Sequence, residues 1–563
     1  MERYLSQEST LVVLGGLLTH FIFNAFEPHR PLVWVFLFLA PPLALVWNLH
    51  LPYSSAPLLL LKHLATLVAS VVVYRLSPLH PLAHVPGPLH LKVSNLVIAF
   101  ISIRGGKRYE LIAKLHKRYG KIVRIGSDQV SFADAQAAKA CMSTKDGLPR
   151  AIGYATAETA ETPGSIMTSY AAFYPNPAKV HAERRARWAL GFTSKAMREY
   201  DTFLLPRLER LLRKVGEQQG AVDLGKWLSY FTFDFMGDLF FDGGFNMLND
   251  QDADGFWKII EEFAPVIDFL YYLPWLTPIM MALPGGDDAP INKFVRFAVK
   301  CVNDRLAKGN TVKDVFHYVA GEHIEDENKV KPSRAVIESD VQTGIVGGAD
   351  TAASAMANTV FSLLMNPDKL KRLQHELDTA FAGEGVDPND SARLAQLPYL
   401  DACINETLRV FPQYRHEFLV ECLAVMVGYM LPEFHFQIPT RKDVHGLPTL
   451  RYPPRSSLFL PNPDSWLPER WLADAERTMG QPFIMNLDAF MPFSIGPANC
   501  VGRNLAMREM RLVIAQLIYR YNVQPVEKDP EEFQRKWLAE LRDHHVLLKG
   551  PLNVVLTPRS PAL

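Results

Sequence analysis

The first 76 residues carry so little charge that they constrain the fold more than any other part of the chain. Residues 9–26, 31–49 and 56–74 contain a single Asp, Glu, Lys or Arg between them, Lys62. Helices of about 20 apolar residues can cross a bilayer with every backbone hydrogen bond made internally. We therefore predict that residues 1–76 form a membrane anchor of two or three transmembrane helices.

Two other interpretations of this segment compete with membrane helices. A cleaved signal peptide needs a basic start before a short apolar stretch and a cleavage site of small residues, and here further apolar stretches follow the first. Buried helices of a water-soluble core are the second alternative, which requires other parts of the chain to cover the whole segment. Integral membrane helices explain the pattern better than either.

Charge and cysteine content exclude several classes of protein. The 59 Lys and Arg residues balance 59 Asp and Glu residues, and no long basic run occurs. We expect no nucleic-acid binding, because nothing in the sequence supplies a basic stripe for phosphates. The five cysteines are scattered without Cys-x-x-Cys spacing, which disfavours a disulfide scaffold or a zinc ribbon.

Prolines and hydrophobic spacing divide the chain after the anchor. Residues 77–90 contain four prolines and predict a stiff hinge. Residues 121–125 and 129–132 alternate like the strands of a short hairpin, whereas residues 193–382 have mostly helical spacing. We predict a body over residues 91–563 that is mainly α with small β regions.

A very apolar stretch lies within this helical region, at residues 263–283. Core packing is the default explanation for such a stretch. A lid that dips into the membrane or faces a ligand is the alternative. The sequence leaves both open.

One cysteine lies in a loop that suggests metal binding. Phe493, Gly496, Cys500 and Gly502 fall within ten residues, directly before a helical run at 504–521. Free backbone N–H groups at a helix start stabilise a thiolate, so this position predicts a lowered thiol pKa and a metal ligand. A buried structural cysteine at a junction of loop and helix is the alternative.

A second candidate lies in a helix predicted over residues 336–364. The adjacent Gly347 and Gly348 weaken this helix, by about 1 kcal/mol each. A closely bound ligand would explain them, and the Thr351 hydroxyl can bond the carbonyl of Gly347 one turn earlier. Asp350 and Thr351 could then relay protons into a cavity. Close helix packing with a solvated Asp350 is the alternative.

Two further motifs are uninformative in isolation. Glu406 and Arg409 lie on one face of a helix predicted at residues 397–410, and Arg470 lies in the loop-like sequence Pro-Glu-Arg-Trp. Charged pairs at this helical spacing are common on surfaces and add only about 0.2–0.5 kcal/mol.

The order of these motifs resembles the cytochrome P-450 superfamily. Gly-Gly-Ala-Asp-Thr is followed by Glu-x-x-Arg, Pro-Glu-Arg-Trp and Phe-x-x-Gly-x-x-x-Cys-x-Gly, and the separations also match. The resemblance covers about residues 75–525, and the sequence at 497–500 is similar to that of membrane-bound fungal members. It implies the cytochrome P-450 fold behind an N-terminal transmembrane anchor.

The resemblance also implies roles for individual residues. Cys500 would be the axial thiolate ligand of the iron of haem b, iron protoporphyrin IX. Asp350 and Thr351 would deliver protons to bound dioxygen. Gly496 and Gly502 would let the loop approach the porphyrin closely, and Phe493 would shield the pocket of the cysteine ligand. His181 and Arg185 would contact a haem propionate. Glu406, Arg409 and Arg470 would form a buried structural network.

Two departures from the family pattern bear on activity. Ala498 stands where family members most often have an Arg that pairs with a haem propionate, and residues 411–462 lack the usual Pro-rich turn and His-Arg-Asp-Pro-like segment. A divergent insertion or an error in the gene model would explain the second departure. An inactive or non-monooxygenase haem protein of the same fold is therefore the alternative to the function below.

The resemblance implies that the protein is a membrane-anchored monooxygenase. Such an enzyme would insert one oxygen atom from O2 into an apolar substrate such as a secondary metabolite, terpenoid, steroid or aromatic xenobiotic. Electrons would come from NADPH through a separate NADPH-cytochrome reductase, which would dock on the cysteine side against Arg503, Arg508 and Arg511. We expect the anchor to lie in the bilayer of the endoplasmic reticulum, with the catalytic domain facing the cytosol.

Overall fold

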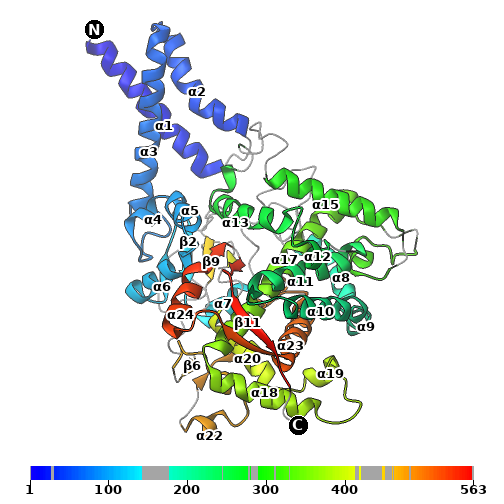
Figure 1. Cartoon of the computed structure of the whole chain (residues 1–563). Coiled ribbons are helices and arrows are strands. Elements are labelled where there is room, and N and C mark those ends of the chain that lie inside the picture. Colours follow the sequence, from blue (N-terminus) through cyan, green and yellow to red (C-terminus); the bar gives the residue numbers. More distant parts are fainter. Residues whose placement is uncertain are drawn as a thin grey trace.

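The computed structural model is a helical body from which an N-terminal bundle projects (Figure 1). It describes residues 2–26, 31–142, 177–243, 245–276, 279, 290–309, 312–326, 328, 330–412, 418–419, 447–450, 459–460, 462–480, 484–544 and 546–560. Helices dominate these residues and the strands are short, which confirms the prediction of a mainly α fold with small β regions.

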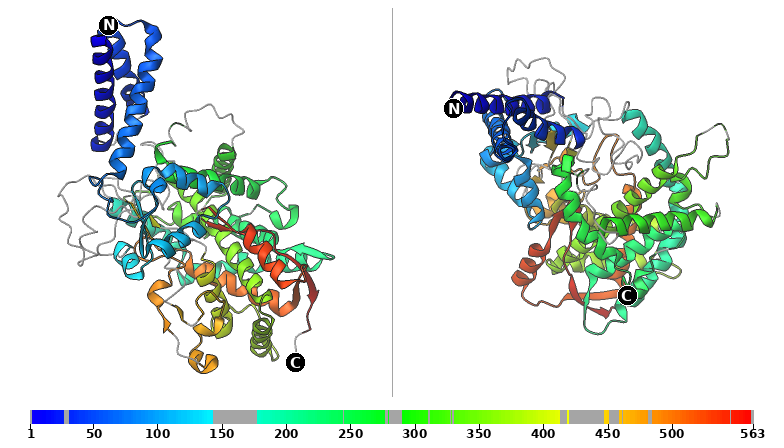
Figure 2. Two further views of the ribbon diagram at one scale, coloured as in Figure 1. Left: turned by 90° about the vertical axis from the view of Figure 1, so that its left-hand side faces the viewer. Right: turned by 90° about the horizontal axis from the view of Figure 1, so that it is seen from above.

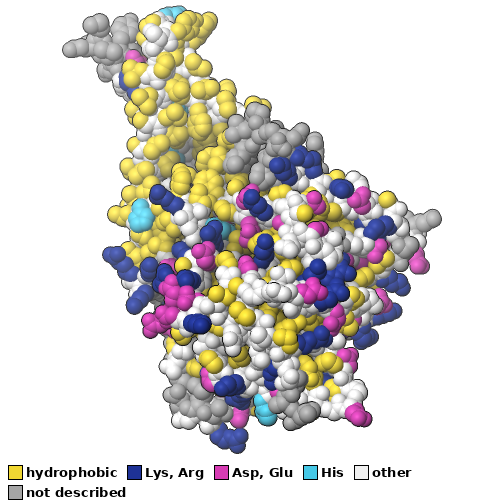
Figure 3. Space-filling view, viewed as in Figure 1, with side chains coloured by type: hydrophobic (Ala, Val, Ile, Leu, Met, Phe, Trp, Pro, Cys, Tyr) yellow, Lys and Arg dark blue, Asp and Glu magenta, His cyan; other side chains and the backbone are white. Residues whose placement is uncertain are grey.

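The bundle consists of three helices, α1 (Glu2–Phe26), α2 (Pro31–Asn48) and α3 (Ala56–Leu76) (Figures 1 and 2). Among the described residues, Gln7–Phe26 and Tyr53–Leu76 are long and apolar enough to cross a membrane, and α2 is shorter. Apolar side chains cover the outside of the bundle (Figure 3). This is the surface that helices in contact with lipid need.

Small and polar residues bring the helices of the bundle together. A Cβ atom at Gly16 of α1 would lie 2.9 Å from Cβ of Thr66 on α3, so glycine permits the close approach. Nearby, His20 Nδ1 and Ser70 Oγ are 2.6 Å apart. Small residues and interhelical hydrogen bonds are typical of helices that associate within lipid.

The body contains the other elements. Its described α-helices are α4 (Leu89–Val93), α5 (Asn95–Ile103), α6 (Arg108–Tyr119), α7 (Ala135–Met142), α8 (Pro177–Gly191), α9 (Ser194–Glu199), α10 (Asp201–Gly216), α11 (Leu224–Phe241), α12 (Met247–Asp250), α13 (Phe256–Tyr272), α15 (Pro290–Ala307), α16 (Val315–Val319), α17 (Arg334–Leu364), α18 (Pro367–Phe381), α19 (Ser391–Leu394), α20 (Pro398–Val410), α22 (Ala475–Met479), α23 (Arg503–Arg520) and α24 (Pro530–Glu540). The described 3-10 helices are η1 (Tyr53–Ser55), which directly precedes α3 in the bundle, and η3 (Pro274–Leu276), η4 (Pro468–Trp471) and η5 (Leu487–Ala489) in the body.

The strands form small sheets. They are β1 (Ile122–Arg124), β2 (Gln129–Phe132), β3 (Ala221–Asp223), β4 (Phe418–Leu419), β5 (Leu447–Leu450), β6 (Phe459–Leu460), β7 (Ile484–Met485), β8 (Tyr521–Pro525), β9 (Arg542–His544), β10 (Val546–Leu548) and β11 (Asn553–Pro558). The largest described sheet has the order β1-β2-β5-β4. In it β1 and β2 are antiparallel with Ile122 opposite Phe132, which confirms the predicted hairpin. Strand β2 pairs in parallel with β5, with Gln129 opposite Leu447.

The core of the body lies where α11 packs along α17. A Cβ atom at Gly344 would lie 2.1 Å from the ring of Phe240, and one at Gly348 would lie 2.2 Å from Met236 Sδ. Glycine at these two positions therefore lets α11 approach α17 closely. The helix predicted at residues 336–364 is confirmed, and α17 begins two residues earlier, at Arg334.

The apolar stretch at 263–283 divides after α13. Tyr271 and Tyr272 end that helix in a cluster of buried side chains that also contains Ile98 of α5, so this half is core. Trp275, in η3, is half exposed and its ring contacts Trp34 of α2 with the centroids 6.3 Å apart. Most of the remaining residues of the stretch lie outside the described part of the chain.

Candidate functional site

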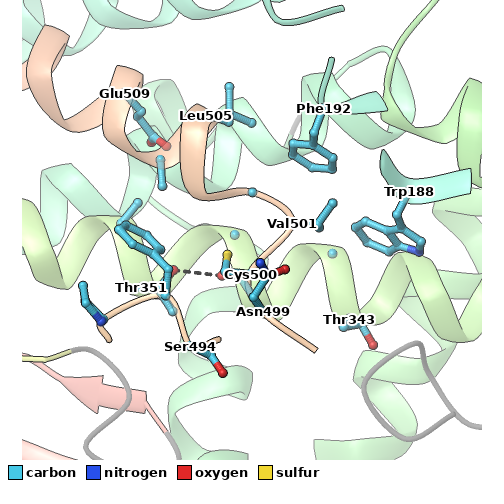
Figure 4. A pocket seen from close by; sticks show the side chains of 18 of the residues that line it. Trp188, Phe192, Thr343, Thr351, Ser494, Asn499, Cys500, Val501, Leu505 and Glu509 are labelled. Carbon is cyan, nitrogen blue, oxygen red and sulfur yellow. Dashed lines mark hydrogen bonds between the residues drawn. The ribbon is translucent and has the colours of Figure 1, made fainter. Parts of the chain in front are cut away.

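A cavity opens between α8, α11, α17, α23 and the loop that precedes α23 (Figure 4). Its walls are mainly apolar, with large side chains from α8 and α11. The described lining residues that carry polar or ionisable side chains are His181, Arg185, Trp188, Thr343, Thr351, Ser494, Asn499, Cys500 and Glu509. The cavity is therefore largely apolar, with a few separate polar groups on its walls.

Tight turns deliver Cys500 into this cavity. Gly496 has φ of +74°, in the left-handed region that glycine adopts most easily. The Cys500 N–H donates to the carbonyl of Phe493 (2.8 Å), and the Asn499 N–H donates to that of Gly496 (3.2 Å). Gly502 is the N-cap of α23. Cys500 is accessible because it faces the cavity, although protein surrounds it.

The electrostatics of Cys500 correct one prediction. Burial away from water raises the pKa of the thiol, against the lowering effects of N–H groups of Gly502 and Arg503 and the charge of Arg185. The helix start alone predicts a lowered thiol pKa. Removal from water outweighs these groups, so the sulfur is a thiol unless a bound cation completes the site.

Helix α17 presents Gly347 and Thr351 to the cavity. A Cβ atom at Gly347 would meet nothing within 4 Å, so this glycine leaves open space. The Thr351 hydroxyl donates to the Gly347 carbonyl (2.8 Å), as predicted from their spacing (Figure 4). Both glycines line the cavity, but only Gly348 also permits the close approach of α11.

Asp350 does not join Thr351 at the cavity wall. It is only 5% exposed, so the alternative of a solvated Asp350 is wrong. It forms a hydrogen bond with Trp257 of α13 and lies near Lys549, while burial raises the pKa of its carboxyl. Adjacent residues of a helix point in different directions, and Asp350 points toward Trp257 rather than into the cavity.

His181 and Arg185, both on α8, line the cavity and bind the cysteine loop. His181 Nε2 lies 3.1 Å from the carbonyl oxygen of Pro497. Arg185 donates to the backbone carbonyl of Asn499 (2.6 Å) and to its side-chain oxygen. The structure therefore brings both residues to the loop that carries Cys500, with Ala498 between their two partners at the cavity wall.

Glu406, Arg409 and Arg470 meet in a fully paired cluster away from the cavity. Arg409 Nε donates to Glu406 Oε2 (2.7 Å), and Arg470 Nε donates to Glu406 Oε1 (3.1 Å). The indole of Trp471 and the N–H of Leu467 also donate to Glu406. Because every member of this buried network is paired, it ties α20 to η4 as a structural unit.

Two features of the site fall outside the sequence predictions. Glu509 lines the cavity from α23 and was not identified, although a single Glu within an apolar helix face is a signal that could have drawn attention to it. Residues 411–462, where the sequence departs from the family pattern, lie largely outside the described residues.

Comparison with known proteins gives the class to which this fold and site belong. Residues 86–549 match the Cytochrome P450 family, and the chain belongs to that family. It is a monooxygenase, like the curated fungal proteins that it resembles.

The relatives cover nearly the whole chain. Cytochrome P450 monooxygenase FCK2 of Fusarium pseudograminearum is 29% identical over 89% of this chain and 86% of its own length. Tryprostatin B 6-hydroxylase of Aspergillus fumigatus is 27% identical over 90% of this chain and 86% of its own. Sesterfisheric acid synthase of Neosartorya fischeri is 27% identical over 82% of this chain and 90% of its own.

The residues present fit the haem-thiolate iron that this family implies. A flat and largely apolar macrocycle needs an apolar slot, and the cavity supplies one with open space at Gly347. Iron needs a thiolate donor, and Cys500 faces that slot. Carboxylate groups at the edge of the macrocycle need hydrogen-bond donors, and His181 and Arg185 lie at the wall.

Proposed function

We propose that this protein is a membrane-anchored monooxygenase in which Cys500 ligates the iron of haem b. One observation carries the proposal: among the described cysteines, Cys500 is the one that faces the apolar cavity. N–H groups of Gly502 and Arg503 stabilise the thiolate form of this sulfur. Hydrogen bonds of this kind orient a metal ligand and tune the metal.

The wall of the cavity beside Cys500 would hold the polar edge of the haem. Arg185 and His181 supply nitrogen donors there, and Ala498 supplies none. We propose that these two residues of α8 take the role that an Arg at position 498 would have had. Bound haem iron would activate O2 for insertion of one oxygen atom into a C–H bond, with two electrons and two protons consumed.

Thr351 would hold a hydroxyl at the reaction site. Its hydrogen bond to Gly347 fixes the side chain at the cavity wall, where the hydroxyl oxygen can accept a hydrogen bond from water. Asp350 would act behind it as a buried acid, because burial raises the pKa of this carboxyl. We propose that both residues contribute to proton delivery, Thr351 directly and Asp350 from outside the cavity.

The electrons would come from NADPH through a separate NADPH-cytochrome reductase that docks on the cysteine side. Of the three arginines considered for that face, Arg508 is bound to Asp201 and Arg511 to Asp401. Their charges are therefore largely neutralised. Arg503 is exposed and stacks over the ring of Phe493 at 5.8 Å, which leaves it available to an acidic partner.

The substrate would be an apolar natural product. The names of two relatives identify a hydroxylase of tryprostatin B and a synthase of sesterfisheric acid. These two compounds, one a substrate and one a product, differ, so the relatives support the class of secondary metabolites rather than one compound. The apolar α1 and α3 would hold the enzyme in the membrane of the endoplasmic reticulum, with the body in the cytosol.

The proposal is tested by a reduced carbon-monoxide difference spectrum of membranes that contain the full chain. We expect a strongly red-shifted haem band in the wild type and its complete loss in Cys500→Ala, because a thiolate ligand produces that shift. Cys301→Ala is the matched control, since this half-buried thiol on α15 lies outside the cavity. Persistence of the band in Cys500→Ala, or its absence from expressed wild type, would overturn the proposal.

A further inference from the structure

A buried ion pair joins α8 to α17. Arg184 of α8 donates from Nη2 to Asp340 Oδ1 (2.8 Å) and from Nε to Asp340 Oδ2 (3.4 Å). Arg184 is 4% exposed and Asp340, on α17, is 1% exposed. A two-point contact between guanidinium and carboxylate fixes the angle between the two groups as well as their distance. The pair therefore holds one particular alignment of the two helices.

Helical spacing places this pair next to residues of the cavity wall. On α8, Arg184 comes three residues after His181 and directly before Arg185, and both of these residues line the cavity. On α17, Asp340 comes three residues before Thr343, which also lines the cavity (Figure 4). Residues three or four apart in a helix are neighbours on its surface. The ion pair thus adjoins the cavity wall without belonging to its described lining.

A second arginine of α8 also depends on Asp340. Burial lowers the pKa of the Arg187 guanidinium, and the charge of Asp340 opposes this effect. Asp340 therefore faces two cations of one helix, Arg184 in direct contact and Arg187 at longer range. A buried charge that loses its partner is costly. Without the Asp340 charge, we expect α8 to move away from α17 toward water.

The position of α8 decides where its two cavity-lining donors lie. His181 and Arg185 reach the backbone carbonyls of Pro497 and Asn499, at 3.1 and 2.6 Å. Between these two positions, Ala498 lines the cavity without a side-chain donor. Hydrogen bonds from nitrogen to oxygen are effective only over about 2.7–3.2 Å. A displacement of α8 by about 1 Å is therefore enough to lose the donors that the edge of a bound haem needs.

We propose that Asp340 is a positioning residue. Through Arg184 it holds α8 where the donors of that helix, His181 and Arg185, reach the propionate groups of the bound haem. The inference rests on the proposed function and adds Asp340 and Arg184 to it. Neither of these two residues lines the cavity, so their contribution to haem binding passes through the placement of α8.

The first measurement is the rate at which haem leaves the ferric, full-length protein for excess apomyoglobin. Asp340→Asn removes the charge and keeps the shape of the side chain. We expect haem loss to be faster by about tenfold or more, because a hydrogen bond to a charged group contributes at least about this factor.

A second buried pair supplies the matched control. Asp378 of α18 is 9% exposed and accepts a hydrogen bond from Arg559 (2.8 Å), and neither residue belongs to the described cavity lining. Asp378→Asn makes the same chemical change and should leave the rate of haem loss within about twofold of the wild type. An Asp340→Asn variant that lost haem no faster than this control would overturn the inference.

Resonance Raman spectroscopy separates positioning from general destabilisation. The bending band of the haem propionates reports the hydrogen bonds that these groups accept. We expect the band to shift in Asp340→Asn in the same direction as in Arg185→Gln, and to stay in place in Asp378→Asn. A merely structural role of the ion pair would not move it, so an unshifted band in Asp340→Asn would also overturn the inference.

A double substitution tests whether Asp340 acts through α8. In an Arg185→Gln background, Asp340→Asn should accelerate haem loss by less than it does in the wild type, because one of the donors that it positions is already absent. Equal acceleration in the two backgrounds would mean that the residues act independently and would overturn the inference. So would normal haem loss in both Arg185→Gln and His181→Phe.

Loss of folding is recognised separately. The carbon-monoxide difference band reports haem-loaded protein in every variant. If Asp340→Asn lacks the band, Asp340→Glu enters the same measurements, because it keeps the charge and moves the carboxylate by one methylene group. Loss of the band from both variants would assign the ion pair a role in folding and overturn the inference. A wild type without the band would instead contradict the proposed function.

Discussion

Glu406 and Glu509 are both buried glutamates of the helical body, and their surroundings are opposite. Glu406 is 0% exposed and accepts hydrogen bonds from Arg409, Arg470 and Trp471. Glu509 is 1% exposed, and its Oε1 has no partner in the part of the chain that the structure describes. The two glutamates are thus equally buried, but only Glu406 has hydrogen-bond partners for both of its carboxylate oxygens. A paired carboxylate stabilises a framework, whereas an unpaired one is held neutral at a cavity wall.

Removing the charge of Glu406 should have the largest effect on stability. The Glu406→Gln variant leaves the guanidinium groups of Arg409 and Arg470 buried without a carboxylate. Loss of one partner from a buried ion network lowers the free energy of unfolding by about 3–5 kcal/mol. Denaturant titration of detergent-solubilised protein, followed by the carbon-monoxide band, measures this loss.

An exposed glutamate gives the matched control for that variant. Glu531→Gln in α24 makes the same chemical change at the surface and should alter the free energy of unfolding by no more than about 0.5 kcal/mol. If Glu406→Gln were as stable as this control, the contrast between paired and unpaired burial would be lost.

The pH dependence of stability should reveal the opposite character of Glu509. The folded protein keeps its proton up to about pH 8, whereas the unfolded chain releases it near the ordinary pKa of 4.5. The folded state thus binds more protons in this window, so the contribution of Glu509 to stability is greatest below pH 4.5 and falls as pH rises to about 8. The slope is at most about 1.4 kcal/mol per pH unit.

The variant Glu509→Gln has no such group, and this makes the prediction measurable. The free energy of unfolding of the variant minus that of the wild type should rise from pH 5 to pH 8 and level off above it. Denaturant titrations at several pH values in one detergent provide the two curves. Curves that stay parallel across this range would show that Glu509 titrates normally.

Glu469, which is 7% exposed, offers an intermediate case with a smaller expected effect. Its Oε1 atom accepts a hydrogen bond from the Tyr399 hydroxyl (2.8 Å), and Arg372 and Lys369 lie at 3.6 and 3.8 Å. Tyr399→Phe removes one partner and leaves the two cations. We expect a loss of about 1 kcal/mol in the free energy of unfolding, with an unchanged carbon-monoxide band.

The exposed Tyr53 provides the control for that substitution. Tyr53→Phe should leave the denaturant midpoint where it is, because its hydroxyl group meets no buried acceptor. If Tyr399→Phe had the same denaturant midpoint as this control, the two cations alone would satisfy Glu469. A loss of several kcal/mol in the free energy of unfolding would instead mean that Glu469 depends on its partners as strongly as Glu406 does.

Local patterns predicted much of the fold. The helix α17, the hairpin of β1 and β2 and the helix after Cys500 all follow from spacings of a few residues. The hydrogen bond from Thr351 to Gly347 also follows, because the two residues are one helical turn apart. Glu406 and Arg409 pair for the same reason. Arg470 is 64 residues from Glu406 in the sequence, so only the family resemblance, and no local spacing, predicted its place in this cluster.

Other features depend on which surfaces pack together. The sequence placed Asp350 beside Thr351 in a helix, but the packing of α13 decides that its carboxyl meets Trp257 instead of the cavity. Arg508 and Arg511 were expected to face a partner, and they are bound by acids that come from α10 and α20. A short sequence window contains no information on contacts of this range.

By itself the sequence determined the apolar N-terminal helices, the mainly helical body and the loop that presents Cys500, because each depends on residue types within one or two turns. Only the tertiary structure decided the environment of each ionisable group. It raised the pKa of the Cys500 thiol where a helix start alone predicted the reverse, and it left Glu509 unpaired at the cavity wall. The physical reason is desolvation, which is set by how many distant segments close around a group and not by its neighbours in the chain.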